Sequence, residues 1–123
     1  MNSKIKLGMK TRKSVLGKDH LDKVSENVTD LDKPFQEFIT EYAWGNVWSS
    51  PKLSKRERSM LTLVILASQG SYEEFKLHVK ACKNTETSPD DMIEAMMHVA
   101  IYAGLPKANS AIKLIKEEIK LWN

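Results

Sequence analysis

The chain has 123 residues, a formal net charge of +3 and 41% hydrophobic residues. That length is enough for one domain with a modest core and too short for two ordinary domains, so we expect a single domain over residues 1–123. No stretch approaches the ~20 apolar residues of a membrane span, and the basic start of the chain is not followed by the apolar segment of a signal peptide. We therefore expect a cytoplasmic protein without a membrane partner.

One cysteine and a slight positive charge exclude further classes. A single cysteine cannot form a disulfide within the chain, and it cannot supply a Cys-x-x-Cys redox or zinc pair. Lysines and arginines are concentrated near the N-terminus, but acidic residues are scattered through the rest of the chain. This weak charge pattern predicts no nucleic-acid partner.

Helical signals begin in the first half of the chain. Residues from about 14 to 26 and from about 33 to 44 carry apolar side chains at three- and four-residue spacing, which predicts two helices. A Trp-rich turn ending at Ser50-Pro51 follows them. Ser54 and Glu57 then form a capping-box pattern, and the helix that they open is apolar on nearly every side, so we expect it to be central.

Three further helices are predicted in the second half. Ser71 and Glu74 form another capping-box pattern and open the fourth helix. Ser88-Pro89 opens the fifth helix and Pro106 the sixth. Because no segment shows strand alternation or an internal repeat, the sequence predicts an all-α bundle of about six helices.

Glu74, His78 and Cys82 are four residues apart and would form one row along the fourth helix. Such a row spans about 12 Å of helix axis, which is too far for all three side chains to share one metal ion. His98 could add a ligand from another helix, but no spacing pattern predicts it. The sequence therefore predicts no metal site.

Each member of this row also has a structural explanation. Capping explains Glu74 better than catalysis does, and a lone helical cysteine such as Cys82 is usually a small buried hydrophobe. His78 lies between the apolar residues Leu77 and Val79, where a satisfied core histidine is the more common case. A partly buried imidazole near a carboxylate can nevertheless transfer protons around neutral pH.

Two other groups could line a binding site. Trp44 and Trp48 are four residues apart, although aromatic groups of this kind more often belong to a core. Arg56 and Arg58 fall in the first turn of the central helix, where cations oppose the helix dipole. That mild cost hints that one arginine is retained for an anion, and a solvated helix face is the alternative.

Four segments together resemble one family over almost the whole chain. They are KSVLG (13–17), FQEFITEYAWGNVWSSPKLSKRERSMLTLVILASQG (35–70), LHVKACKN (77–84) and HVAIYAGLPKANSAI (98–112). They resemble the small carboxymuconolactone decarboxylases, a cofactor-free branch of the group that also contains alkylhydroperoxidase D. The resemblance implies an all-helical fold, often assembled as a homohexamer of three dimers. It also implies decarboxylation of 4-carboxymuconolactone to a 3-oxoadipate enol-lactone in aromatic catabolism, the β-ketoadipate pathway.

The resemblance also bears on the row of three residues. In the peroxidase branch a Cys-x-x-Cys-x-x-x-His motif lies on the corresponding helix, and His78 matches its histidine. Ser71 and Glu74 stand at the two cysteine positions, so the redox pair is absent. What remains is an imidazole with a carboxylate one turn away, which suits acid–base chemistry. A lactone of this kind supplies its own electron sink, so the resemblance implies no cofactor.

The resemblance assigns roles around a small anionic lactone substrate. His78 would donate the proton or stabilise the enolate, and Arg56 or Arg58 would anchor a carboxylate. The remaining candidates are Glu57 and Glu74 as catalytic carboxylates, and Trp44, Trp48, His98 and Tyr102 as side chains that bind substrate.

Two other functional classes remain open. A thiol-dependent peroxidase relative would need Cys82 to be acidic and exposed. A non-catalytic helical binding protein would need no pocket at all, and a structure in which His78 is sealed among aliphatic side chains would support that class.

Overall fold

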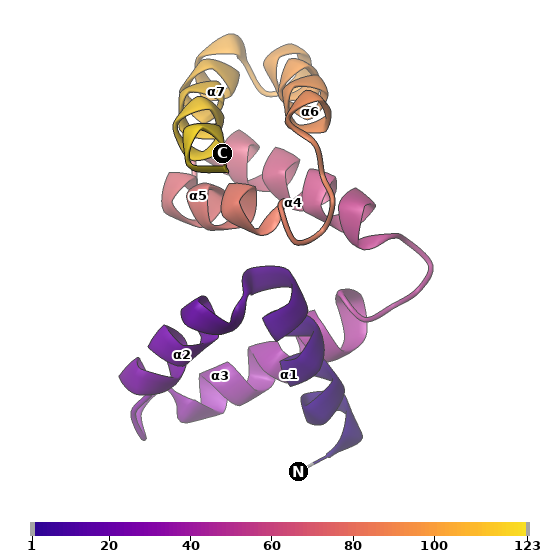
Figure 1. Ribbon diagram of the computed structural model, residues 1–123, viewed down its shortest axis with the longest axis vertical. Coiled ribbons are helices and arrows are strands. Elements are labelled where there is room, and N and C mark those ends of the chain that lie inside the picture. Colours follow the sequence, from indigo (N-terminus) through magenta and orange to yellow (C-terminus); the bar gives the residue numbers. More distant parts are fainter. Residues whose placement is uncertain (1, 123) are drawn as a thin grey trace. The chain divides into compact units, whose positions relative to one another are not determined.

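The computed structural model describes residues 2–122, and every regular element in this range is a helix, which confirms the all-α class. None of the described helices is both long and apolar enough to cross a membrane. In chain order the elements are α1 (Ser3–Leu16), α2 (Lys18–Asn27), α3 (Lys33–Ile39), the π-helix η1 (Thr40–Val47), α4 (Lys55–Gln69), α5 (Tyr72–Ala81), α6 (Pro89–Tyr102), α7 (Leu105–Ile119) and the 3₁₀-helix η2 (Lys120–Trp122) (Figure 1).

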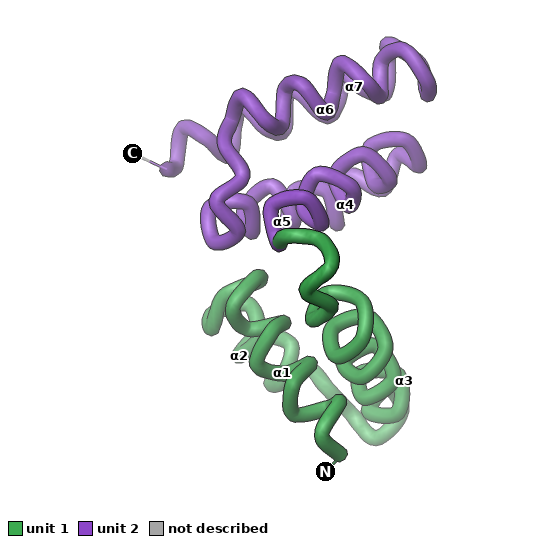
Figure 2. The backbone as a smooth tube through the Cα atoms, turned by 90° about the vertical axis from the view of Figure 1, so that its right-hand side faces the viewer, with its two compact units in different colours: residues 1–54 green, residues 55–123 purple. Residues whose placement is uncertain are grey.

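The chain divides into two compact units (Figure 2). Unit 1 extends to Ser54 and contains α1, α2, α3 and η1, whereas unit 2 begins at Lys55 and contains α4 to η2. Each unit has its own helix packing. The expected single domain over residues 1–123 stays a prediction.

The predicted helix over about 14–26 is wrong in its boundaries, because Gly17 divides it. Gly17 has a φ of +91°, which glycine adopts without steric cost, and α1 ends before it while α2 begins after it. Helix α1 also begins eleven residues earlier than predicted, at Ser3, where the Asn2 side chain accepts a hydrogen bond of 2.7 Å from the Ile5 amide. Its polar sequence has too few apolar side chains to show a helical period.

The predicted helix over about 33–44 is present and continues further than expected. The α-helix α3 continues directly into the wider π-helix η1, which ends at Val47. The predicted Trp-rich turn is therefore wrong for the residues up to Val47, which are helical. The amide of Trp48 bonds to the carbonyl of Ala43 at 2.9 Å, which is the five-residue step of a π-helix. Long π-helices are rare, and this one places Trp44 and Trp48 in a stack with ring centroids 5.1 Å apart.

Helix α1 packs closely against η1 through two glycines. A Cβ atom on Gly8 would overlap the carbonyl oxygen of Thr40, and one on Gly45 would overlap the carbonyl oxygen of Lys4. The obstacles are backbone atoms, which cannot rotate away as the end of a flexible side chain could. The backbones of the two helices can therefore approach this closely only with glycine at both positions.

We expect Gly8→Ala to lower the free energy of unfolding by about 1–3 kcal/mol, the usual cost of overpacking. A decrease in the free energy of unfolding would be informative, because replacing glycine by alanine stabilises most helix interiors. Urea denaturation measures the change, and Lys6→Ala at an exposed position of the same helix should alter it by less than about 0.5 kcal/mol. Unchanged or higher stability of Gly8→Ala would contradict the close approach.

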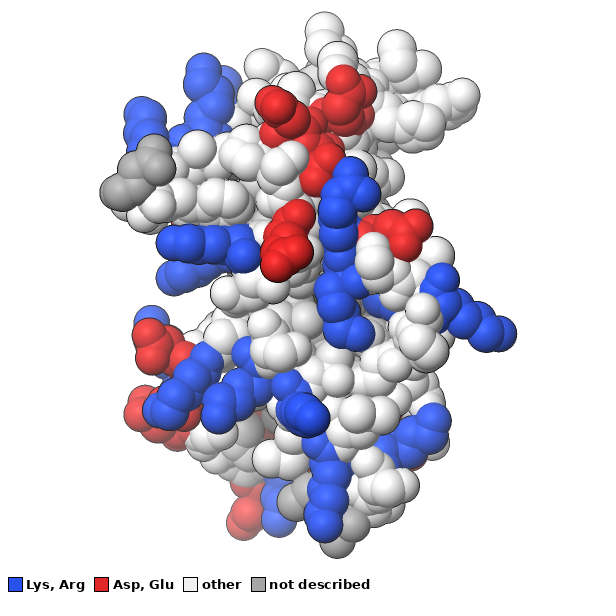
Figure 3. Space-filling model, turned by 45° about the vertical axis from the view of Figure 1, so that its right-hand side comes forward, with Lys and Arg blue, Asp and Glu red and all other residues white. Residues whose placement is uncertain are grey.

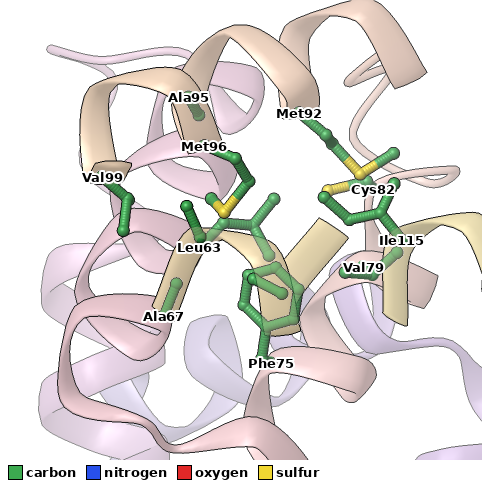
Figure 4. Packing of buried hydrophobic residues seen from close by; sticks show 12 residues of the cluster. Leu63, Ala67, Phe75, Val79, Cys82, Met92, Ala95, Met96, Val99 and Ile115 are labelled. Carbon is green, nitrogen blue, oxygen red and sulfur yellow. The ribbon is translucent and has the colours of Figure 1, made fainter. Parts of the chain in front are cut away.

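Unit 2 is a two-layer arrangement in which α6 and α7 pack on α4 and α5 (Figure 2). The core lies between the layers, and Phe75 of α5 points into it toward Leu63 and Met96 (Figure 4). Helix α4 contacts α5, α6 and α7, as its central role predicts. The buried members of the cluster are Leu63, Ala67, Phe75, Val79, Cys82, Met92, Ala95, Met96, Val99, Ala108, Ala111 and Ile115.

In unit 2 the predicted start of α6 at Ser88-Pro89 is confirmed, whereas the predicted capping box of α5 is wrong. At α6 the capping box is present: Ser88 Oγ accepts from the Asp91 amide and Asp91 Oδ2 accepts from the Ser88 amide, both at 3.0 Å. At α5 the predicted capping box is wrong, because Ser71 occupies the N-cap position but its side chain makes no capping hydrogen bond. Its backbone angles, φ −85° and ψ 68°, lie outside the extended conformation in which a cap side chain reaches the first turn.

Candidate active site

His78 is held at the edge of the core face of α5. This helix buries Phe75 and Val79 completely, and His78 is adjacent to Val79 in the sequence. A step of one residue turns the side chain by 100° around the helix, so His78 leaves the centre of the core face while it remains only 9% exposed. The imidazole is therefore positioned by helix packing and largely shielded from water.

The row of Glu74, His78 and Cys82 changes environment along its length. Glu74 is exposed, His78 is buried and Cys82 is fully buried, because a four-residue step drifts around the helix toward the core. The three side chains therefore do not form one site. No group of three or more His, Cys, Asp or Glu side chains that could hold a metal ion occurs among residues 2–122.

Arg56 and Arg58 lie on different faces of α4. Two residues correspond to about 200° around a helix, so the two guanidinium groups point nearly opposite ways. Arg56 forms a bidentate ion pair with Asp91 at the start of α6, with Nε–Oδ2 at 2.8 Å and Nη2–Oδ1 at 2.6 Å. Hydrogen bonds from Arg56 and from the Ser88 amide hold the pKa of Asp91 well below its usual range. Arg58 is half-buried.

Glu57 lies between these arginines and is exposed in the first turn of α4. An acidic side chain at this end of a helix is favoured by the helix dipole. Its position is therefore also what a stable helix start requires.

His98 and Tyr102 form a second group, on the outer side of α6. Their ring centroids are 4.8 Å apart with the planes tilted by 31°, as expected for residues one turn apart. Both side chains are exposed, and Tyr102 is 79% exposed. Within one chain this pair faces solvent.

Trp44 and Trp48 belong to unit 1, and both are buried. Their rings are stacked and almost fully buried, which favours the core interpretation over an open pocket wall. The structure thus divides the predicted site residues into a buried histidine on α5, an exposed pair on α6, two arginines with separate directions on α4, and a tryptophan pair in unit 1.

Cys82 is enclosed by apolar and hydroxyl side chains. It lies beside Met92 and Ile115 in the core (Figure 4). Burial raises the pKa of the thiol to about 11, and hydrogen bonds with Thr87 and Ser59 offset only part of that shift. A thiol with this pKa is protonated at neutral pH and is a poor nucleophile.

Three buried hydroxyl groups beside Cys82 were not anticipated from the sequence. Ser59 Oγ lies 2.7 Å from Thr85 Oγ1, which lies 2.9 Å from Thr87 Oγ1. These linked hydroxyl groups connect α4 with the turn after α5. In that turn Glu86 adopts a left-handed φ of +60°. The contact between Arg56 and Asp91 was likewise not predicted, since no sequence spacing relates two residues that are 35 apart.

We expect native Cys82 to react with Ellman's reagent at pH 8 at least about 100-fold more slowly than the same residue in the unfolded chain. Both the raised pKa and the absence of exposed thiol surface act in this direction. The measurement compares absorbance time courses with and without guanidinium chloride. Rapid labelling of one thiol per native chain would contradict the burial of Cys82.

Comparison with known proteins places these features in a family context. The sequence pattern of the Carboxymuconolactone decarboxylase family matches residues 33–117. A 4-carboxymuconolactone decarboxylase from Acinetobacter baylyi is 38% identical over 94% of this chain and 86% of its own length. A nitrosuccinic acid decarboxylase from Metarhizium robertsii is 37% identical over 91% of this chain and 78% of its own length.

Proposed function

The chain belongs to the carboxymuconolactone decarboxylase family, and on that premise we propose that it removes carbon dioxide from a small dianionic acid without a cofactor. Both relatives compared above are named decarboxylases, so the chain is a carbon–carbon lyase. The favoured substrate is 4-carboxymuconolactone or a related carboxylated lactone.

The two acids in the relatives' names share the chemistry that makes a cofactor unnecessary. When a carboxylate leaves 4-carboxymuconolactone, the electron pair of the broken carbon–carbon bond moves through the ring double bond into the lactone carbonyl. In nitrosuccinic acid the nitro group on the carbon that bears a carboxylate can accept the same pair. Each molecule also keeps a second carboxylate that can be anchored. We therefore propose a substrate class defined by a leaving carboxylate, an electron acceptor conjugated with it and a second anionic group.

The protein's part in this reaction is to bind, orient and donate one proton. Carbon dioxide leaves, the acceptor oxygen takes the charge, and a proton then adds to carbon to complete the reaction. We assign the proton donor to His78, whose imidazole is held by α5 with little contact with water. We assign the carboxylate anchor to Arg58, because it is half-buried, and a guanidinium that is partly shielded from water binds a carboxylate more strongly than an exposed one.

The observation that carries this proposal is the contrast between His78 on α5 and Cys82 at the C-cap of the same helix. The thiol is fully buried with a raised pKa, which argues against a thiol-dependent peroxidase, whereas the imidazole lies at the edge of the core. Glu57 and Glu74 are exposed, and we place them as supporting carboxylates. A non-catalytic binding protein would keep its behaviour when His78 is replaced, so the same variant tests that class too.

We also propose that the chain functions as a homo-oligomer, with a hexamer of three dimers as the expected form. Unit 2 exposes several large apolar side chains on α4 and α6, and exposed apolar side chains of this kind favour association with another chain. If another subunit covered this surface, His98 and Tyr102 of α6 would be shielded from solvent. Such shielding is what a substrate-binding role for these two side chains would require. The exposed apolar residues are Leu61, Ile65, Met97, Ile101 and Tyr102.

We expect His78→Asn to lower kcat for carbon dioxide release by about 10² to 10⁴-fold, the usual contribution of one general acid. His98→Asn is the matched control and should cost less, because its ring is exposed on α6. Both variants are assayed with 4-carboxymuconolactone and with nitrosuccinate, and thermal unfolding checks that each is folded. Near-full turnover by His78→Asn with loss in His98→Asn would show that the other histidine is the acid.

Sedimentation velocity at micromolar concentration should show an oligomer, and Ile101→Glu should shift it toward the monomer. A carboxylate at this position would have to be buried without a partner on association. The matched control is Leu121→Glu, which changes an apolar side chain of similar exposure outside α4 and α6. A monomeric wild-type protein, or equal dissociation by both variants, would count against this interface.

A further inference from the structure

A groove of about 900 Å³ lies within unit 1, between α1, α2 and α3. Its volume is in the range of small-molecule sites, and its walls are mainly apolar. The apolar lining residues are Ile5, Met9, Leu21, Val24 and Val28. No residue that we assign to decarboxylation lines it.

Helix α2 supplies one wall and buries none of its own residues. Leu21 and Val24 lie one turn apart on this helix and are only half-buried, and Val28 follows at its end. An amphipathic helix normally buries its apolar side against a neighbour. Here that side faces the groove, so a bound apolar group would complete its burial.

The guanidinium of Arg12 lies in the lining of the groove. The residue is only 8% exposed, and its Nη1 atom donates to Gln36 Oε1 at 3.0 Å and to Thr40 Oγ1 at 3.5 Å. Thr40 Oγ1 in turn donates to the Gln36 carbonyl at 2.7 Å. This network fixes the orientation of a planar cation in a mainly apolar hollow, an arrangement suited to a carboxylate.

The charge around Arg12 reinforces that preference. The groove lining has four cationic side chains against two acidic ones, and lysine and arginine side chains stand close together over unit 1 (Figure 3). One of the acids, Asp22, is paired with Lys18 outside the lining at 2.7 Å. The charged lining residues are Lys10, Arg12, Lys13, Lys33, Asp22 and Glu37.

We propose that this groove binds an amphiphilic carboxylic acid, with the carboxylate at Arg12 and the apolar body along Leu21, Val24 and Val28. A small molecule fits better than a polypeptide segment, because the charge that the groove would recognise is concentrated at one largely buried side chain with fixed partners. The site is independent of the proposed decarboxylation, since every residue in it belongs to unit 1 and none is assigned a catalytic role.

The test uses the full-length protein and dodecanoate, well below its micelle concentration, as the probe. Isothermal titration calorimetry should show one site, and amide shifts in a ¹⁵N–¹H spectrum should map to α1, α2 and α3. Butanoate, which has the head group without the long tail, and dodecyltrimethylammonium, which has the tail with a cation, should both bind at least about tenfold more weakly.

Variants separate the head-group contact from the tail contact. Arg12→Gln should weaken dodecanoate binding by about 10- to 100-fold. Val24→Glu, at a half-buried wall position, should abolish binding while the fold persists, which keeps the test valid if Arg12→Gln unfolds. Lys10→Gln should weaken binding severalfold, whereas Lys6→Gln should not; both lysines are exposed on α1, but only Lys10 lines the groove.

Three results would overturn the proposal. They are unchanged binding to Val24→Glu, equal binding of dodecyltrimethylammonium, and shifts confined to residues outside the groove. Failure of dodecanoate to bind, with the same amide shifts produced by an acidic amphipathic peptide, would likewise reject a small acid in favour of a polypeptide ligand.

Discussion

Burial of one face of α5 is the constraint on which unit 2 depends. Phe75, Val79 and Cys82 all point into the cluster between the two helix layers, and each is fully buried. Because their side chains fix the rotation of α5, they also fix His78, which lies one residue before Val79. The imidazole thus owes its position at the core edge to its apolar neighbours, and the chain needs no dedicated loop to hold it.

The same packing explains why the Cys82 thiol is expected to be unreactive. It occupies the most enclosed position of its row and is covered by Met92, Ile115 and the hydroxyls of Ser59 and Thr87. The thiol therefore contributes volume to the core and is a poor nucleophile.

The Arg56–Asp91 pair offsets the mild cost of placing a cation in the first turn of α4. A cation in the first turn of α4 opposes the helix dipole, but Asp91 lies opposite it at the start of α6 and is already part of the α6 capping box. One carboxylate thus joins two helix starts. Arg58 lies on another face of α4 and takes no part in this pair.

The sequence by itself determined the helical class and several helix ends, because these depend on local chemistry. The start of α6 at Ser88-Pro89 and the apolar character of α4 could be predicted from neighbouring residues. The helix end at Gly17 was not predicted, because a glycine in the sequence is compatible both with a continuous helix and with a break between two helices. Only the tertiary structure decided the Arg56–Asp91 pair, the hydroxyl chain beside Cys82 and the Arg12 groove. These features depend on contacts between distant residues: Arg56 and Asp91 are 35 residues apart, Ser59 and Thr85 are 26 apart, and Arg12 and Gln36 are 24 apart. No local period encodes such contacts.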